Sequence, residues 1–183
     1  MRTVEEVEIY FPGFKAFIDS TEQEIQRPKD KRKRKNYYSG KKKRHTVKTQ
    51  LMVNKEGKIL HKSKYRKGRQ QNDYSVYKDE HPLTPTNVEN YYDLGYHGVE
   101  KDFTNMKVTS PIKKKRNIEL TQKEKRYNKK HSKQRVIVEH TICRIKKFGI
   151  MGNKYRNRLR RYDVVSDIVS GLVNYRIIHT TRR

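Results

Sequence analysis

The apolar residues of this chain are gathered in a few short segments, and runs of lysine and arginine separate these segments. Only 32% of the 183 residues are hydrophobic, whereas 36% are charged. Because a core forms only where apolar side chains can meet, the spacing inside these segments limits which fold is possible. The length and the clustering predict one folded domain with charged segments on its surface.

The apolar segments in the first two thirds of the chain have the spacing of strands. The first is a short run that we expect to end at Asp19. In the second, alternation predicts that Val47, Leu51 and Val53 are buried, and Gly57 marks the turn into the third. The predicted strands are residues 15–18, 45–54, 59–68, 89–98 and 106–115.

The last third of the chain has helical spacing. Thr121 and Glu124 fit a capping box, which predicts a helix start, and Val138, Ile142 and Ile145 share one helical face. The predicted helices are residues 72–80, 132–148 and 163–178, and residues 26–45 are predicted to be a loop. Strands followed by helices predict a mixed α/β sheet with helices packed on it, an order compatible with an RNase H-like architecture.

The charge balance favours a polyanionic partner. Lysine and arginine number 46 against 20 acidic residues, a net charge of +26. Nucleic acid is the commonest partner for such a surface, and a membrane is the weaker alternative because no long basic amphipathic helix is evident. Each basic run alone is typical of a solvated loop, but together with the net charge they favour DNA contact. The runs are residues 31–35, 41–44, 113–116 and 158–161, and Lys41, Lys42, Lys43 and Arg44 are candidate phosphate contacts.

Cysteine content and the N-terminal residues indicate the compartment. Cys143 is the only cysteine, so neither an internal disulfide nor a cysteine zinc site is expected, and we expect it to be a small buried residue. The N-terminus lacks the pattern of a signal peptide, and no apolar run is long enough to span a membrane. We therefore expect a cytoplasmic, nucleoid-associated protein.

Three carboxylates stand out because they lie beside apolar residues. Asp19 follows the first strand-like run, Asp93 lies within the fourth, and Glu139 interrupts an apolar stretch. An aspartate after a strand is most often a turn residue. Phosphodiester chemistry without a protein nucleophile instead needs divalent ions, which take oxygen ligands from two or three carboxylates. The three residues are therefore candidate metal ligands that only folding can bring together.

Glu139 has two cations near its helical face. Arg135 lies four residues before it and Lys146 seven after it. This arrangement suits a site where a metal ion and the DNA backbone meet. From spacing alone an ion pair on the helix surface is the commoner arrangement, and both interpretations stay open.

The ordered set of motifs resembles the catalytic domain of bacterial insertion-sequence transposases of the DDE superfamily, in the group related to Harbinger elements. The motifs are IDSTEQEIQRP, YYSGKKKRHTVK, DLGYHG and RVIVEHTICRIKKFGIM, and the resemblance covers about residues 10–178. It implies an RNase H-like fold that cleaves DNA and transfers strands. It also implies that Asp19, Asp93 and Glu139 are catalytic and hold two Mg²⁺ or Mn²⁺ ions, while Arg135 and Lys146 position DNA.

The resemblance leaves two points open. Asp73 follows the third predicted strand, as an aspartate does in many relatives, so it is an alternative metal ligand or a helix cap. Relatives usually begin with a helix-turn-helix region, which we expect to be absent here, with residues 1–183 forming one catalytic domain. The expected partners are element ends and target DNA, with a separate DNA-recognition polypeptide and a homodimer as further possibilities. The alternative function is a catalytically inactive DNA-binding remnant.

Overall fold

A mixed β-sheet forms the centre of the computed structural model, which describes residues 3–69, 72–80, 82 and 84–180. Its strands are β1 (Lys15–Glu24), β2 (Tyr38–Ser39), β3 (Arg44–Asn54), β4 (Ile59–Lys62), β5 (Arg66–Lys67), β6 (Glu89–Tyr91) and β7 (Lys107–Thr109). The order is β2-β3-β1-β6-β7, and β4 and β5 also pair with β3. β3 is antiparallel to β1, whereas β6 is parallel to both β1 and β7. The predicted RNase H-like α/β fold is confirmed.

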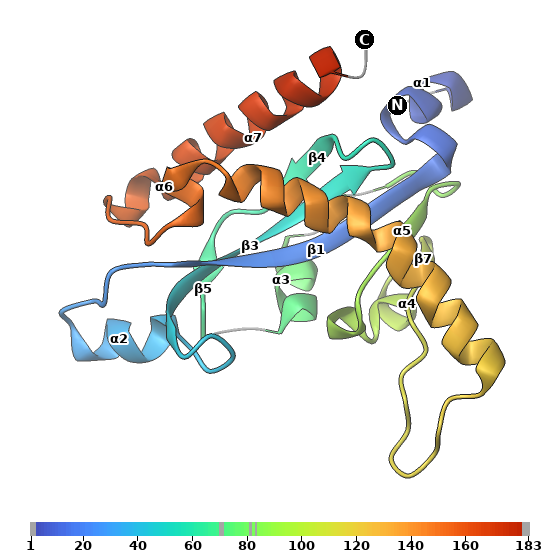
Figure 1. The fold of residues 1–183 in the computed structure, drawn as a ribbon, viewed down its shortest axis with the longest axis horizontal. Helices are drawn as coiled ribbons and strands as arrows, with labels where there is room; N and C mark the ends of the chain where they lie inside the picture. Colours follow the sequence, from blue (N-terminus) through green and yellow to red (C-terminus); the bar gives the residue numbers. More distant parts are fainter. Residues whose placement is uncertain (1–2, 70–71, 81, 83, 181–183) are drawn as a thin grey trace.

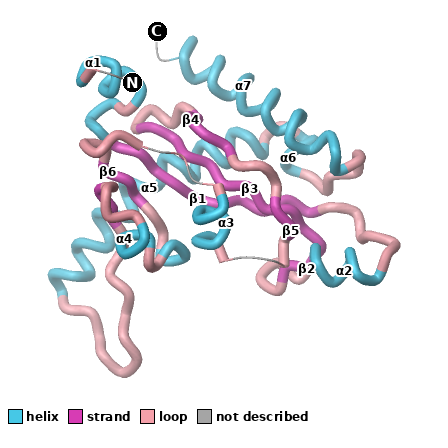
Figure 2. Tube along the Cα trace, turned by 180° about the vertical axis from the view of Figure 1, so that it is seen from behind, coloured by secondary structure: helices cyan, strands magenta, loops and turns pink. Residues whose placement is uncertain are grey.

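Helices cover both faces of this sheet. They are α1 (Val4–Tyr10), α2 (Lys31–Tyr37), α3 (Asp73–Asp79), α4 (Val99–Asp102), α5 (Gln122–Lys146), α6 (Gly149–Gly152) and α7 (Tyr162–Thr180), with 3-10 turns η1 (Pro12–Phe14), η2 (Leu94–Tyr96) and η3 (Leu159–Arg161). The long α5 crosses in front of the sheet in Figure 1, and α3 lies on the opposite face, in front of the strands in Figure 2.

Two apolar cores lie on opposite faces of the sheet. Phe17 of β1 and Leu51 of β3 pack with residues of α5 and α7. Ile18 and Met52, their neighbours along the same strands, pack with residues of α1, α3 and α4. Because strand side chains alternate between faces, Asp19 points to the α5 side, as Phe17 does.

The two long helices follow the predicted patterns. The capping box at Thr121 is present, and Val138, Ile142 and Ile145 are buried as predicted. In α7, Val169 and Val173 are buried, whereas Ile168 and Leu172 are 59% and 47% exposed because they face away from the sheet. No helix within the described residues is long and apolar enough to cross a membrane.

The prediction that the first strand ends at Asp19 is wrong, since β1 continues to Glu24. β3 is long enough to offer backbone partners along the whole extension, up to the pair Glu24 and Thr46. On its other edge, β1 pairs with β6 only as far as Phe17. Asp19 therefore lies within a strand, just beyond the point where one strand edge becomes free.

The predicted loop over residues 26–45 also contains structure. Asp30 accepts a hydrogen bond from Lys33 N (2.7 Å) and caps α2, while Tyr37 at the end of this helix is buried. The cap and the buried ring outweigh the repulsion among the lysines and arginines of this short helix. Helix α2 therefore holds a dense basic surface in a defined position.

The remaining predicted strands are shorter than expected. The third is divided into β4 and β5 because Ser63 Oγ accepts a hydrogen bond from Gln50 N (3.0 Å) and replaces part of the regular ladder. The fourth ends at Tyr91, and the fifth spans only Lys107–Thr109. The short fourth strand places Asp93 in the loop after β6, not inside a strand.

Replacing Leu51 by alanine is expected to lower the free energy of unfolding by about 2–5 kcal/mol, because it leaves a cavity in the core. Leu51 is 1% exposed, whereas Leu172 on α7 is 47% exposed and serves as the control. Leu172→Ala should change stability by less than about 1 kcal/mol. Urea unfolding followed by circular dichroism measures both, and equal losses would contradict the core position of Leu51.

Candidate active site

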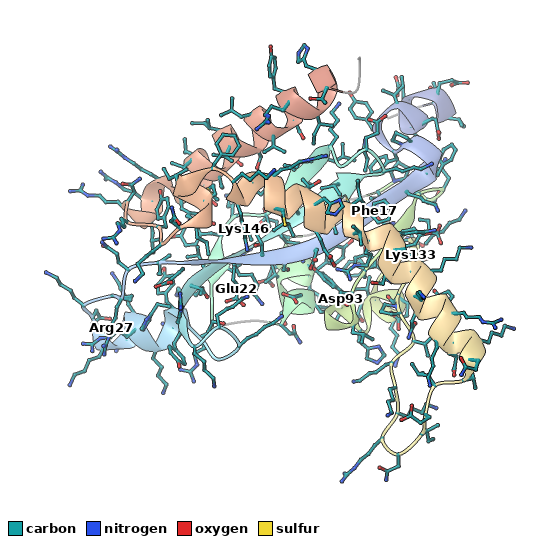
Figure 3. All side chains as sticks on the ribbon, viewed as in Figure 1. Phe17, Glu22, Arg27, Asp93, Lys133 and Lys146 are labelled. Atoms are coloured by element: carbon teal, nitrogen blue, oxygen red, sulfur yellow. The ribbon has the colours of Figure 1, made fainter. Side chains whose placement is uncertain are left out.

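Five acidic residues line one open groove, and four of them come from separate elements. Asp19 comes from β1, Asp73 from the start of α3, Asp93 from the loop after β6, and Glu139 from α5. We call this cavity of about 530 Å³ the acidic groove. It is also lined by Ser20, Thr21, Glu22, Lys41, Lys42, Lys48, Asn72, Gly95, Ile142, Cys143 and Lys146. Figure 3 labels three of its residues, Glu22, Asp93 and Lys146.

Arg135 joins two of the acids. Its guanidinium donates to Asp19 Oδ2 at 3.0 Å and lies 3.4 Å from Asp93 Oδ1. The other oxygen of Asp19 accepts from Ser20 N at 2.7 Å. The sequence predicts that Arg135 contacts DNA, yet its side chain is only 8% exposed and lies against carboxylates. One buried cation therefore holds the two aspartates at a common point.

Burial raises the pKa of Asp19 to about 6. Arg135 and the Ser20 hydrogen bond lower this pKa, while the nearby charges of Asp93 and Asp73 raise it. Repulsion among these carboxylates therefore persists even with the guanidinium in place. An additional cation in the groove would relieve this repulsion and favour the ionised form of Asp19.

Asp73 already has a cationic partner. Lys48 Nζ donates to Asp73 Oδ1 at 2.9 Å, and the lysine side chain is 11% exposed. The cap of α3 is Asn72, whose side chain accepts from Ser75 N, so Asp73 is the first helical residue instead. Lys48 thus compensates the charge of Asp73 in part, although this charge still raises the pKa of Asp19.

The packing around the Asp-Leu-Gly-Tyr segment accounts for its residue types. Asp93 accepts a hydrogen bond from Leu94 N at 2.8 Å, which fixes the start of η2. A Cβ on Gly95 would lie 2.9 Å from Asp73 Oδ2, so any other residue would require the Asp73 carboxylate to shift. Tyr96 is fully buried beneath the groove. The glycine and the tyrosine set the position from which Asp93 reaches the site.

A buried polar network under the groove was not predicted from the sequence. The Tyr96 hydroxyl lies 3.0 Å from Ser20 Oγ and accepts from Gln50 Nε2 at 2.7 Å. Gln50 also donates to the carbonyl of Asp73 at 3.3 Å. Burial raises the pKa of Tyr96, so its hydroxyl stays protonated. A signal in the sequence was the polar Gln50 directly before the apolar run of residues 51–53.

Glu139 lies on the exposed side of α5. Within the described chain it forms no ion pair with Arg135 or Lys146, so the helix-surface pair is not present. Partial burial, and then the charge of Lys42, lower the pKa of Lys146. Cys143, expected to be buried, is exposed and lines the groove, because the core face of α5 is occupied by Val138, Ile142 and Ile145.

The other predicted DNA contacts divide into two groups. Lys41 and Lys42 line the groove, whereas Lys43 and Arg44 do not. Arg44 Nη1 instead donates to Glu24 at 2.7 Å, and Glu24 also binds Lys154 at 2.8 Å. Both partners lower the pKa of Glu24. Lys41 and Lys42 of the β2–β3 turn therefore line the groove without an ion pair among the described residues. Arg44 beside them is paired with Glu24.

The carboxylates of the groove fit a hard divalent cation in chemical type, since all are oxygen donors and repel one another at Asp19. Among the described residues, no group of three His, Cys, Asp or Glu side chains is close enough to hold one ion. In this arrangement Arg135 supplies the positive charge between Asp19 and Asp93. An ion bound there would share or replace that contact.

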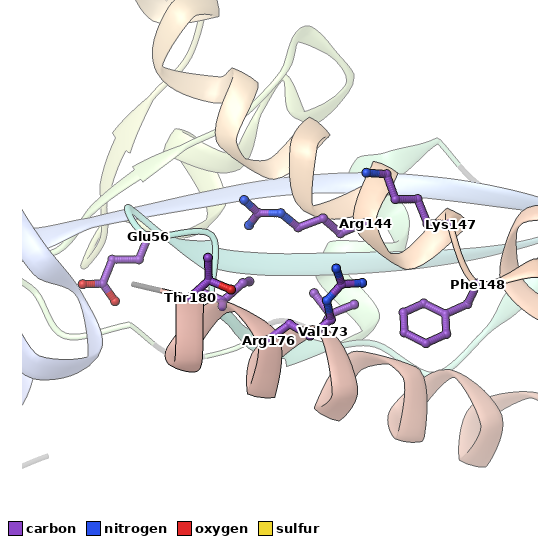
Figure 4. Close-up of a pocket in the computed structure, with 8 residues that line it drawn as sticks. Glu56, Arg144, Lys147, Phe148, Val173, Arg176 and Thr180 are labelled. Atoms are coloured by element: carbon purple, nitrogen blue, oxygen red, sulfur yellow. The ribbon is translucent and has the colours of Figure 1, made fainter. Parts of the chain in front are cut away.

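A second cavity of about 300 Å³ lies between α5 and α7 (Figure 4). Its lining residues are Glu56, Arg144, Lys147, Phe148, Val173, Arg176, Ile177 and Thr180. It shares no residue with the acidic groove and has one carboxylate. It is therefore not a second candidate for the metal chemistry predicted from the sequence.

The sheet order and the carboxylate-lined groove define an RNase H-like domain with an acidic site beside the free edge of its first strand. The family model described as DDE superfamily endonuclease matches residues 18–174, so the chain belongs to this family. It is 34% identical over 160 residues to the probable transposase for insertion sequence element IS702 of Microchaete diplosiphon. This match covers 87% of the chain but only 56% of that relative, and no solved structure matches the chain. The family supports a role in transposition.

Replacing Arg135 by glutamine is expected to lower the free energy of unfolding by about 1–3 kcal/mol at pH 8 in EDTA, because the Asp19 carboxylate loses its partner. The loss should be smaller at pH 5. Below its pKa of about 6, Asp19 is protonated in the folded protein and needs no counter-charge. Denaturant unfolding at both pH values measures this.

Arg144→Gln, on the exposed side of the same helix, is the control and should show a small change that does not depend on pH. An equal loss for Arg135→Gln at pH 5 and pH 8 would show that Arg135 acts through packing alone.

Proposed function

We propose that this chain is a transposase catalytic domain that cleaves DNA at a 3′ end and joins the freed 3′-hydroxyl to target DNA. The observation that carries the proposal is the meeting of Asp19 and Asp93 at Arg135, in a groove that also receives Glu139 and free lysines. Carboxylates that repel one another beside cations suit a site for a metal and a phosphate. Membership of the DDE superfamily endonucleases supports the same reading.

Within this proposal the acids and the cations have separate roles. Asp19, Asp93 and Glu139 would hold Mg²⁺ or Mn²⁺, and two bound ions supply activation of the attacking oxygen and stabilisation of the leaving oxygen. Lys41, Lys42 and Lys146 would hold the DNA backbone at the rim of the groove. Arg135 would keep the two aspartates oriented, and its phosphate contact stays a prediction.

A DNA-binding protein without catalysis is the second candidate function. The observation that favours it is that both oxygens of Asp19 already have hydrogen-bond partners within the protein. In that case Arg135 permanently occupies the place of a metal ion. The basic rim would still bind DNA, so only a measurement of cleavage separates the two functions.

The partners beyond DNA are proposals, since the chain spans about half the length of the IS702 transposase. The single-domain organisation, the separate recognition polypeptide, the homodimer and the nucleoid location stay predictions from the sequence.

Asp19→Asn is expected to reduce Mg²⁺-dependent nicking of supercoiled plasmid on the order of 10²-fold or more, because it removes the charge that holds the metal. The fold and the affinity for duplex DNA should change little, since asparagine can still accept from Ser20 N. Asp167→Asn on α7, where the side chain is 63% exposed, is the matched control. Undiminished nicking by the Asp19 variant would contradict the assignment of Asp19 as a metal ligand, whereas no nicking by the unchanged protein would leave DNA binding as the function.

Comparing Asp93→Asn with Asp73→Asn in the same nicking assay tests which aspartate is the second metal ligand beside Asp19. We expect the Asp93 variant to lose nicking as the Asp19 variant does, and the Asp73 variant to retain most of it, because Lys48 is already paired with Asp73. Glu139→Gln should also lose nicking. A Mg²⁺ titration of each variant separates weaker metal binding from lost chemistry, and the opposite ranking would assign Asp73 as the ligand.

A further inference from the structure

A second basic site lies at the end of the molecule that carries α2. This cavity of about 700 Å³, called here the basic pocket, is lined by Arg27, Arg34, Lys35, Tyr38, Gly40, His45 and Arg69. Figure 3 places Arg27 at this end, away from Asp93 in the acidic groove. The two sites share the β2–β3 turn, because Gly40 lines the pocket and Lys41 and Lys42 line the groove. A DNA strand lying along this turn would pass from one site to the other.

The charge of the basic pocket is not neutralised by the protein. Four of its lining residues are lysine or arginine and none is acidic. In the described part of the chain, none of these four cations forms an ion pair with a carboxylate, unlike the neighbouring Arg44. Such a site attracts an anion, and a phosphate group satisfies several cations at once.

Arg34 has an unused donor at this site. Its Nη2 donates to the carbonyl of Lys29 at 2.9 Å, which holds the side chain in place. Its Nε is buried and has no hydrogen-bond partner among the described residues. The fixed guanidinium is one of the four cations that a phosphate in the pocket would contact.

Two aromatic rings line the basic pocket. Tyr38 and His45 are cross-strand partners on β2 and β3, with ring centroids 5.6 Å apart and planes at 72°. Tyr38 is 41% exposed. Burial, and then the charges of Arg27 and Arg34, lower the pKa of His45, so its imidazole is neutral at pH 7 and offers a ring face instead of a charge. Bases of single-stranded nucleic acid stack on such rings.

We propose that the basic pocket binds one unpaired nucleotide of DNA, with its phosphate on the arginines and its base against Tyr38. The backbone of a duplex presents phosphates but no free base, so it would leave the aromatic surface uncovered. The inference rests on the proposed function for the identity of the ligand as DNA. It adds that the chain recognises a frayed or displaced strand next to the groove.

The test is fluorescence anisotropy with two labelled probes, a single strand of about 15 thymidines and a duplex of equal length. This length lies within the site sizes of single-strand-binding domains. EDTA is present, so binding is read without cleavage. Tyr38→Ala is expected to weaken binding of the single strand at least about fivefold, while binding of the duplex changes less than about twofold. Tyr38→Phe keeps the ring and should bind as the unchanged protein does.

Tyr175→Ala on α7, where the ring is 62% exposed, controls for the loss of any surface tyrosine. Thermal unfolding of each variant confirms that the fold is kept. Equal weakening for both probes, or no weakening for either, would overturn the proposal. Because EDTA prevents cleavage, a failed Asp19→Asn assay would leave this result standing, and a failed Tyr38→Ala assay would not affect the catalytic assignment.

Discussion

The contact of Arg135 with Asp19 and Asp93 is the interaction on which the rest of the site depends. It connects α5, β1 and the loop after β6, three parts of the chain that no local sequence signal links. Buried charges persist only when they are paired, so neither Asp19 nor Arg135 could occupy this place alone. The same contact brings Glu139, one turn further along α5, to the rim of the groove.

The groove exists because one strand edge is left open. β6 pairs with β1 only to Phe17, while β3 supports β1 to Glu24, so the chain after β6 can turn away and leave room beside Asp19. The buried hydroxyl of Tyr96 then fastens this chain back to Ser20 and Gln50. A short strand and one buried network together convert a sheet edge into a cavity.

Local sequence patterns predicted the helices and strands that have strong periodicity. They could not predict contacts between residues that are distant in the sequence. Alternation located the inward residues of β3, and the capping box located the start of α5. The extension of β1 depends on the length of β3, and the helix α2 depends on the cap at Asp30. The spacing of apolar residues therefore predicts neither of them. The candidate acids could be predicted from their scarcity in a basic chain, but their partner Arg135 shows no sign of burial in the sequence.

The positions of the few acids determine which cations of this chain, with its net charge of +26, stay unpaired. Glu24 neutralises Arg44 and Lys154, and Asp73 neutralises Lys48, so these cations contribute little to the field outside the protein. The lysines of the β2–β3 turn and the arginines of the basic pocket have no such partners in the described chain. These cations extend from the basic pocket to the acidic groove, and the carboxylates of the groove lie at the end of this line.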